Sequence, residues 1–190
     1  MRADARRNRA AILKAARELF ASERPEVQID DVARRAGVGV GTVYRHFPDK
    51  EALMGELVRA RFGVFNERLR EAIAAGEQEG ADAFAVLVSA LRDNAASVAA
   101  DAATRFAFMS GGERVFAHAD DEKAEFLELA EVLVERAHAT GDLREDFTAA
   151  DIPMVMCATC ATMGKLDAGW DWRRHLELIL GGMRAAPAAA

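Results

Sequence analysis

Apolar residues recur along most of the chain with the spacing of an α-helix. Between residues 9 and 20 they fall at i, i+1, i+4, i+7 and i+8, which places them on one face: Ile12, Leu13, Ala16, Leu19 and Phe20. The segment from Ser22 to Pro25 then ends this first helix. Comparable stripes occupy most of the remaining chain, and the pattern therefore predicts an all-α protein.

A long helix is predicted over residues 49–75, where Asp49 can cap the first turn. Roughly 27 residues at about 1.5 Å each give a helix of about 40 Å. The polar segment at 76–80 (GEQEG) follows it. We assign residues 1–48 to a first domain and residues 49–190 to a second domain, with 49–75 as the connecting helix.

Five more helices are predicted after this break, each from an apolar stripe that begins near an acidic residue. They start near Asp82, Asp101, Glu122, Asp151 and Asp171. Thr148 and Asp151 together fit a capping box at the start of the fourth of the five.

Residues 29–48 (IDDVARRAGVGVGTVYRHFP) contain two short helices joined by a glycine turn. Gly37 is predicted to end the first of them, where a left-handed residue is needed. Val32, Ala33 and Val43 are expected to face inward and close a small core. The outward residues include hydroxyls, a ring and cations, which bind phosphates and base edges. Together with the helix before it, the segment has the anatomy of a helix-turn-helix DNA reader.

The charge is unevenly distributed along the chain. The net charge of −6, taken alone, argues against a DNA-binding protein. Residues 1–50 nevertheless carry 11 Lys and Arg against 7 Asp and Glu, a balance of +4, and residues 51–190 carry 14 against 24, a balance of −10. The basic end is therefore the predicted DNA-reading end.

No segment of the sequence has the pattern of a signal peptide or a membrane span. The N-terminal arginines lead directly into an amphipathic helix, and the longest apolar run, from Ile152 to Met163, is too short to cross a bilayer. We expect a globular cytoplasmic protein without a membrane partner.

The stretch from Arg9 to Phe20 and the run VARRAGVGVGTVYRHFPDKEAL resemble the N-terminal domain of the TetR/AcrR (tetracycline-repressor-like) family of transcriptional regulators. The pattern AGV-x-x-GT-x-Y-x-HF-x-x-K-x-x-L has many fixed positions at fixed spacing within residues 8–57. Two residues depart from it: Gln28 stands where the family usually has Thr or Ser, and Gly39 where it often has Ser. The resemblance implies a three-helix DNA-binding domain followed by a helical ligand-binding and dimerisation domain.

The resemblance also implies which residues contact double-stranded operator DNA. Thr42, Tyr44 and Lys50 match positions that contact phosphates in TetR-like proteins, and Lys50 adds its charge to the positive end of the long helix. The candidates for base contacts are Val40, which suits a thymine methyl, and Arg45, which suits either guanine or a phosphate.

Four other features of the basic end leave their roles open. The backbone at Gly39 and Gly41 is, with Val40 and Arg45, among the best candidates to touch base edges. His46 can pack beside Phe47 or touch the DNA backbone. The arginines at the start of the chain form either a flexible arm in the minor groove or a solubilising charge run.

A small-molecule effector is implied by the family, whose C-terminal domains commonly bind such ligands. The candidate residues are apolar or aromatic, apart from one arginine that would suit an anionic group; an ordinary helical core is the alternative interpretation. They are Phe62, Phe65, Leu87, Leu91, Arg105, Phe106, Met109, Phe126 and Met156.

A homodimer is also implied, because in this family the last two helices pair with their twofold mates. The candidate interface residues form the apolar stripes of these helices, together with a glycine that permits close approach. They are Met163, Gly164, Leu176, Ile179, Leu180 and Met183.

Cys157 and Cys160 form a CxxC pair, which in other folds marks redox or metal chemistry. No second Cys or His cluster accompanies the pair, so buried free thiols are the favoured interpretation. We predict no metal site, no cofactor, no catalytic residue and no enzymatic activity.

The predicted function is that of a ligand-responsive regulator, foremost a repressor that a small molecule releases from a palindromic operator. The alternatives are a thiol redox regulator that uses Cys157 and Cys160, and an enzyme that carries a DNA-binding head.

Overall fold

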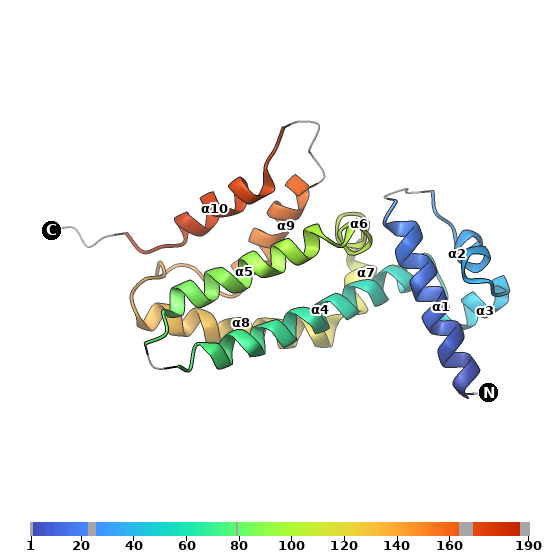
Figure 1. Ribbon diagram of the computed structural model, residues 1–190, viewed down its shortest axis with the longest axis horizontal. Coiled ribbons are helices and arrows are strands. Elements are labelled where there is room, and N and C mark those ends of the chain that lie inside the picture. Colours follow the sequence, from blue (N-terminus) through green and yellow to red (C-terminus); the bar gives the residue numbers. More distant parts are fainter. Residues whose placement is uncertain (1, 23–25, 79, 164–168, 187–190) are drawn as a thin grey trace. The chain divides into compact units, whose positions relative to one another are not determined.

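The computed structural model describes residues 2–22, 26–78, 80–163 and 169–186 (Figure 1). These ranges contain helices and no strand, apart from one isolated bridge between Leu143 and Arg184, so the predicted all-α class is confirmed. The helices are α1 (Arg2–Phe20), α2 (Ile29–Ala36), α3 (Val40–His46), α4 (Lys50–Ala75), α5 (Ala83–Ala99), α6 (Ala102–Ser110), α7 (Glu113–Ala117), α8 (Asp120–Ala139), α9 (Asp151–Met163) and α10 (Trp172–Gly182).

Acidic caps begin the helices where the sequence predicts them. Asp49 accepts a hydrogen bond from the Ala52 amide at 2.8 Å, and Asp101 accepts one from the Thr104 amide at 3.1 Å. Asp82 and Asp171 act in the same way at the starts of α5 and α10. Each cap satisfies an amide that the first helical turn leaves without an intrahelical partner.

The helix α7 was not predicted; it falls between two predicted helices, and its five residues are too few to give a periodic signal. The arginines at the start of the chain were left open between a flexible arm and a charge run, and the start of α1 at Arg2 favours the charge run. The first turns of α1 contain alanines and a pair between Asp4 and Arg7, which favour a helix.

The chain divides into two compact units. Unit 1 comprises residues 1–62 and 100–120, and unit 2 comprises residues 63–99 and 121–190. The helices α6 and α7 thus pack with the N-terminal helices, and α4 contributes its first half to unit 1 and its second half to unit 2. These units differ from the domains predicted at 1–48 and 49–190, because sequence order does not reveal that α6 packs on α1. As a functional division, the predicted boundary stays a prediction.

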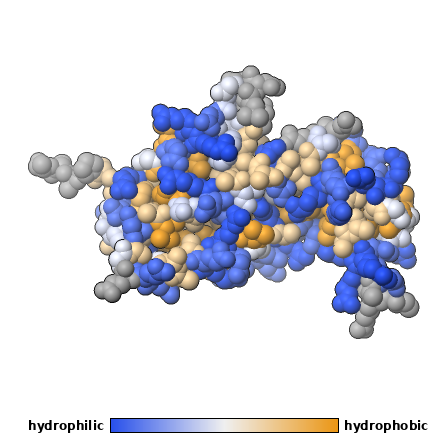
Figure 2. All heavy atoms as spheres, in the orientation of Figure 1, coloured by the Kyte–Doolittle hydropathy of each residue, from blue (hydrophilic) through white to orange (hydrophobic). Residues whose placement is uncertain are grey.

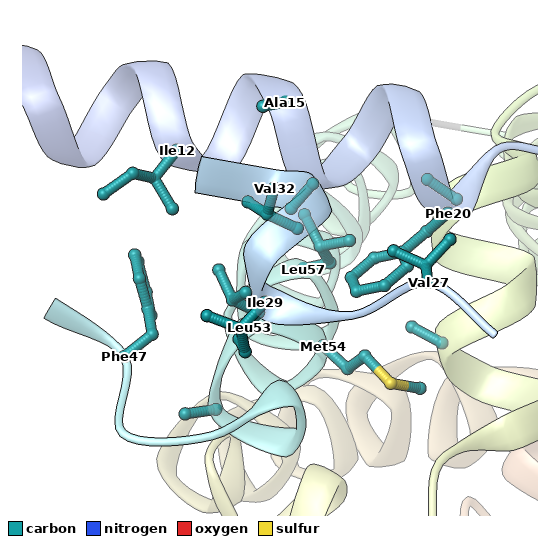
Figure 3. Close-up of a cluster of buried hydrophobic side chains, with 14 of the residues drawn as sticks. Ile12, Ala15, Phe20, Val27, Ile29, Val32, Phe47, Leu53, Met54 and Leu57 are labelled. Atoms are coloured by element: carbon teal, nitrogen blue, oxygen red, sulfur yellow. The ribbon is translucent and has the colours of Figure 1, made fainter. Parts of the chain in front are cut away.

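The core of unit 1 lies between α1, α2, α3 and the start of α4 (Figure 3). Ile12 and Phe20 of α1 are fully buried, as are Val43 of α3 and Leu53 of α4. From α6, Phe106 stacks on Phe20 with ring centroids 5.7 Å apart. Burial of such large side chains contributes about 1.5–3 kcal/mol each, so this cluster fixes the angles between the short helices.

The core of unit 2 is formed by α5, α8, the second half of α4, and α9 with α10. Leu87 and Leu91 of α5 and Leu133 of α8 are each about 1% exposed, and Phe65 of α4 meets Phe126 of α8 with centroids 6.1 Å apart. On the face shown in Figure 2, hydrophilic residues cover much of the surface and apolar residues appear in small groups between them. Helices that bury only one side give this appearance.

Within the described ranges, no single helix is both long and apolar enough to cross a bilayer. Only α5 and α6 taken together, as a bent pair, reach that length and composition.

Candidate nucleic-acid interface

The turn between α2 and α3 has the geometry that the sequence predicts. Gly37 ends α2 with φ 69°, in the left-handed region where glycine is favoured, and its amide donates to backbone carbonyls of the last turn. At the start of α2, the Gln28 amide donates to the Asp31 carboxylate at 3.1 Å. Gln28 stands where the family usually has Thr or Ser, and here the Asp31 carboxylate provides the capping contact.

The helix α3 has one buried side and one open side. Val43 is fully buried and Phe47, which follows the helix, is 3% exposed. On the open side Tyr44 is 50% exposed, and Gly41 and Arg45 are also exposed. The side of α3 that a DNA groove would meet therefore carries a phenol and a guanidinium.

The remaining candidates on α3 lie at the edges of this open side. Val40 is 37% exposed, Gly39 is the exposed N-cap, and Thr42 is half-buried. His46 is half-buried, with its ring centroid 6.3 Å from that of Phe47. Both interpretations of His46 stay open, because a ring beside Phe47 can still present a nitrogen to the DNA backbone.

Lys50 begins α4 and lies against aromatic rings of its own unit. Its ammonium is 5.7 Å from the ring centroid of Phe20 and 5.9 Å from that of Phe106. Such cation–π contacts stabilise by about 0.5–1 kcal/mol when partly exposed. To contact a phosphate, the Lys50 side chain would therefore have to leave these two rings.

Arg9 holds the end of α3 against α4, a role that the sequence did not reveal. Its guanidinium lies 5.4 Å from the Phe47 ring centroid and is 2.8 Å from the Glu56 carboxylate, which also binds Arg59 at 2.6 Å. Burial tends to raise the pKa of Glu56, but the hydrogen bonds from Arg59 and Arg9 outweigh it and lower that pKa. The charged carboxylate is the form that joins α1 to α4.

Two further ion pairs join α6 to α1 and α7 to the start of α4. Arg17 of α1 pairs with Asp101, the cap of α6, and Arg114 of α7 is 2.7 Å from Asp49, the cap of α4. Burial tends to raise the pKa of Asp101, and bonds from Thr104 with the charge of Arg17 lower it overall. The helix α3 thus belongs to a unit whose elements are joined by both packing and charge.

The predicted effector residues fall into both units. Phe62, Arg105, Phe106 and Met109 belong to unit 1, and Phe65, Leu87, Leu91, Phe126 and Met156 belong to unit 2.

In unit 1, the effector candidates have different surroundings. Phe106 is 8% exposed in the core beside Phe20, whereas Met109 is 53% exposed and Arg105 is half-buried. Phe106 also borders an open hollow of about 320 Å³ beside Lys50 and Met54. In unit 2, Phe65, Leu87, Leu91 and Phe126 are core residues and Met156 is half-buried.

Most of the predicted dimer-interface residues are buried within the chain itself. Met163, Leu176, Leu180 and Met183 are each 2–6% exposed, and Ile179 is half-buried. Gly164 lies outside the described residues. The expectation that these stripes face a partner needs correction, because the stripes cover the core of unit 2.

The exposed sides of the last two helices carry other residues. They are Pro153, Met154, Cys157, Ala158 and Ala161 on α9, and Arg173, Arg174, Glu177, Leu178, Gly181 and Gly182 on α10.

Neither cysteine forms a disulfide, and the two thiols have different surroundings. Cys160 is buried as predicted, but Cys157, about one turn earlier on α9, is exposed. Partial burial nevertheless raises the pKa of Cys157, which keeps the thiol protonated and poorly reactive. Within the described residues no cluster of His, Cys, Asp or Glu could hold a metal ion. The redox alternative is therefore unsupported.

The helix α3 has a polar open side, packs on α1 and α2, and follows α2 through a turn with a left-handed glycine. This arrangement is that of a helix-turn-helix DNA-binding protein. Residues 12–57 match the sequence profile of the bacterial regulatory proteins of the tetR family. A helix-turn-helix-type transcriptional regulator of Staphylococcus aureus strain USA300 is 38% identical over 66 residues, which cover 34% of this chain and 36% of that protein. The match thus spans little more than a third of this curated relative.

Solved structures extend the likeness over the whole chain. The TetR transcription regulatory protein from Mycobacterium vanbaalenii is 33% identical, with a TM-score of 0.58, over 97% of this chain and 99% of that one. The FadR regulator from Bacillus subtilis, solved in complex with stearoyl-CoA, is 21% identical over 92% of this chain and 96% of that one, with a TM-score of 0.70, and shares the fold. The chain belongs to the TetR family of transcriptional regulators and is a DNA-binding protein.

Proposed function

We propose that the protein is a homodimeric repressor that a small molecule releases from a palindromic operator. The observation that carries the proposal is the open side of α3, which presents Tyr44 and Arg45 from a helix anchored by Val43. Two such helices in one dimer would enter successive major grooves, with half-sites about 34–36 Å apart. Tyr44, Thr42 and Lys50 would hold phosphates, and Arg45 and Val40 would read bases.

The dimer is proposed to form through the exposed sides of α9 and α10. Met154 is 65% exposed and Leu178 is 60% exposed, and Gly181 and Gly182 permit close approach of a second helix. Large apolar side chains exposed together on neighbouring helices mark an association surface. Sedimentation of a Leu178→Glu variant tests this assignment, since it should yield a folded monomer; an intact dimer would contradict it.

An effector site is proposed within unit 2. The interior there is apolar, yet Asn94 on α5 is 2% exposed and its side-chain oxygen has no hydrogen-bond partner. A buried acceptor of this kind costs about 1–3 kcal/mol, so a bound molecule that satisfies it would gain that contact. FadR from Bacillus subtilis, which shares this fold, was solved in complex with stearoyl-CoA, and an apolar effector with a polar group would suit Asn94.

Operator selection from random duplexes tests the DNA-binding proposal. Selected sites should be palindromic, and with six or more phosphates neutralised, log K should fall with log salt at a slope of about −5 or steeper. Tyr44→Phe and Lys50→Ala should weaken all sequences alike, whereas Arg45→Ala should change base preference at one position in each half-site. A flat salt response without a preferred palindrome would remove the proposal.

Native mass spectrometry of protein from its own host tests the effector proposal. A retained molecule should add a defined mass and, when added back, weaken operator binding roughly 5- to 150-fold, which corresponds to a coupling of about 1–3 kcal/mol. Asn94→Leu should lose the retained mass and keep operator affinity. Equal retention by this variant would place the effector elsewhere.

A further inference from the structure

The Arg45 side chain is hydrogen-bonded along one edge to its own helix. Its Nε donates to the Gly41 carbonyl oxygen at 3.2 Å, and its Nη2 donates to Thr42 Oγ1 at 2.9 Å. Both acceptors lie in the preceding turn, the direction in which long side chains lean in a helix. Nε and Nη2 share one side of the planar guanidinium, so this side is already occupied in the free protein.

The other edge of the guanidinium, formed by Nη1 and the second N–H of Nη2, makes no hydrogen bond to the residues that the structure describes. Arg45 itself is exposed on the open side of α3. Two parallel N–H groups match O6 and N7 of guanine in the major groove. The conformation that binds Thr42 therefore leaves a complete base-reading edge available.

The Thr42 hydroxyl can do two things at once. A hydroxyl has one donor proton and two acceptor lone pairs, so accepting from Arg45 leaves its own proton for a phosphate oxygen. A hydroxyl that accepts from a cation also becomes a better donor, because neighbouring hydrogen bonds polarise one another. Thr42 is half-buried at the edge of the open side, where its position is set by α3.

We propose that Thr42 is a positioning residue for base recognition, which links a phosphate contact to the guanine reading of Arg45. The proposal rests on operator binding by α3 and adds a coupling between two contacts that are otherwise independent. Arginine has one of the largest side-chain entropies, and the bonds to Gly41 and Thr42 remove part of that freedom before DNA arrives. Base discrimination by Arg45 thus depends on a residue that touches no base.

A double-mutant cycle on a selected operator tests the coupling. The position where Arg45→Ala relaxes base preference is identified first, and the affinity for all four bases there is then measured in each variant. Thr42→Val keeps the shape and β-branching of threonine without its hydroxyl, and Thr42→Ser keeps the hydroxyl. Tyr44→Phe is the matched control, since it removes a hydroxyl from the same helix without touching the bond to Arg45.

Thr42→Val should reduce discrimination at that position roughly 2- to 10-fold, the range expected for one hydrogen bond. Thr42→Ser should stay close to the wild-type ratio, and Tyr44→Phe should change affinity without changing the ratio. In an Arg45→Ala background, Thr42→Val should weaken all four bases equally. In the free protein, the guanidinium protons of Arg45 should exchange faster in Thr42→Val than in Thr42→Ser.

A uniform loss of affinity in Thr42→Val, with the base ratio unchanged, would overturn the coupling while leaving operator binding intact. A loss of discrimination that persists without Arg45 would overturn it as well. If Arg45→Ala relaxes no position at all, Arg45 reads no base and the inference fails, although the protein still binds its operator. Failure of the operator proposal is distinct, since the wild-type protein would then select no sequence.

Discussion

The two units join their helices in different ways. In unit 1 the carboxylates of the pairs Arg9–Glu56 and Arg17–Asp101 are only 17% and 19% exposed. In unit 2 the pair between Arg92 and Glu177 lies at the surface, with a carboxylate that is 46% exposed. Surface pairs contribute about 0–1 kcal/mol, and partly buried ones are screened less by solvent.

Unit 2 also contains polar groups that its own fold leaves unsatisfied. The side-chain oxygens of Asn66 and Asn94 are buried without a hydrogen-bond partner. The partly buried ion pairs of unit 1 help to hold α3 in one position. In unit 2, the buried oxygens of Asn66 and Asn94 each reduce stability unless a ligand satisfies them. We therefore expect substitutions to change the free energy of unfolding and the response to a ligand differently in the two units.

The largest expected effect separates the core of unit 2 from its surface. Leu180→Glu places a charge at a position that is 2% exposed and should lower the free energy of unfolding by about 4 kcal/mol or more. Compared at a concentration where both proteins are monomeric, Leu178→Glu, on the exposed side of the same helix, should leave it within about 0.5 kcal/mol. Urea unfolding measures both; equal stability of the two variants would contradict the burial of Leu180.

Two glycines of α4, one in each unit, should respond with opposite sign. A Cβ on Gly55 would lie 2.5–2.7 Å from His118, the residue that follows α7, and one on Gly63 would meet nothing within 4 Å. Gly63→Ala should therefore stabilise by up to about 1 kcal/mol through helix propensity. Gly55→Ala should destabilise by about 1–2 kcal/mol, because the crowding exceeds this gain. Thermal unfolding gives the signs, and two shifts of the same sign would show that His118 does not pack closely on Gly55.

Removing a buried amide should have opposite effects at two positions in unit 2. Asn94→Leu should raise stability by about 1 kcal/mol, since it replaces an unsatisfied group by an apolar one. Asn66→Leu should lower it, because the Asn66 amide donates to the Glu122 carbonyl at 3.0 Å and to Glu125 at 2.8 Å. If Asn94→Leu were instead clearly destabilising, Asn94 would have a structural role and the effector argument would lose its basis.

The smallest expected effect is a pH dependence that originates in unit 1. The folded pKa values of Glu56 and Asp101 are lowered, so their contribution is present above the ordinary carboxyl pKa near about 4 and is lost as the pH falls through the lower folded values. Glu56→Gln with Asp101→Asn should cost about 1 kcal/mol or less at pH 7 and flatten the loss of stability between pH 5 and 3. Glu177→Gln in unit 2 is the control, and an equal effect there would remove the distinction.

The sequence predicted best what local rules determine. The left-handed glycine at Gly37, the buried Val43, the acidic cap at Asp49 and the helix start near Asp101 depend on residues close in sequence, and each was placed correctly. The helix ends follow from the same rules, since a cap needs only its own first turn.

Contacts between distant segments were the part that the sequence did not provide. Nothing in the neighbourhood of Arg9 indicates that it meets Phe47 and Glu56, and nothing near Lys50 indicates the rings of Phe20 and Phe106. The dimer residues were misplaced for a related reason: an apolar stripe shows that a helix side is covered, but not whether its own chain or a partner covers it.

The packing of α6 on α1 has a consequence for how the protein is made. The core of unit 1 needs Phe106, yet about 40 residues that belong to unit 2 are synthesised between Phe62 and Ala100. At about 5–20 residues per second, Phe20 waits several seconds on the ribosome before its partner emerges. The N-terminal helices thus leave the ribosome with part of their apolar surface uncovered, and their final packing is completed only when residue 120 has been added.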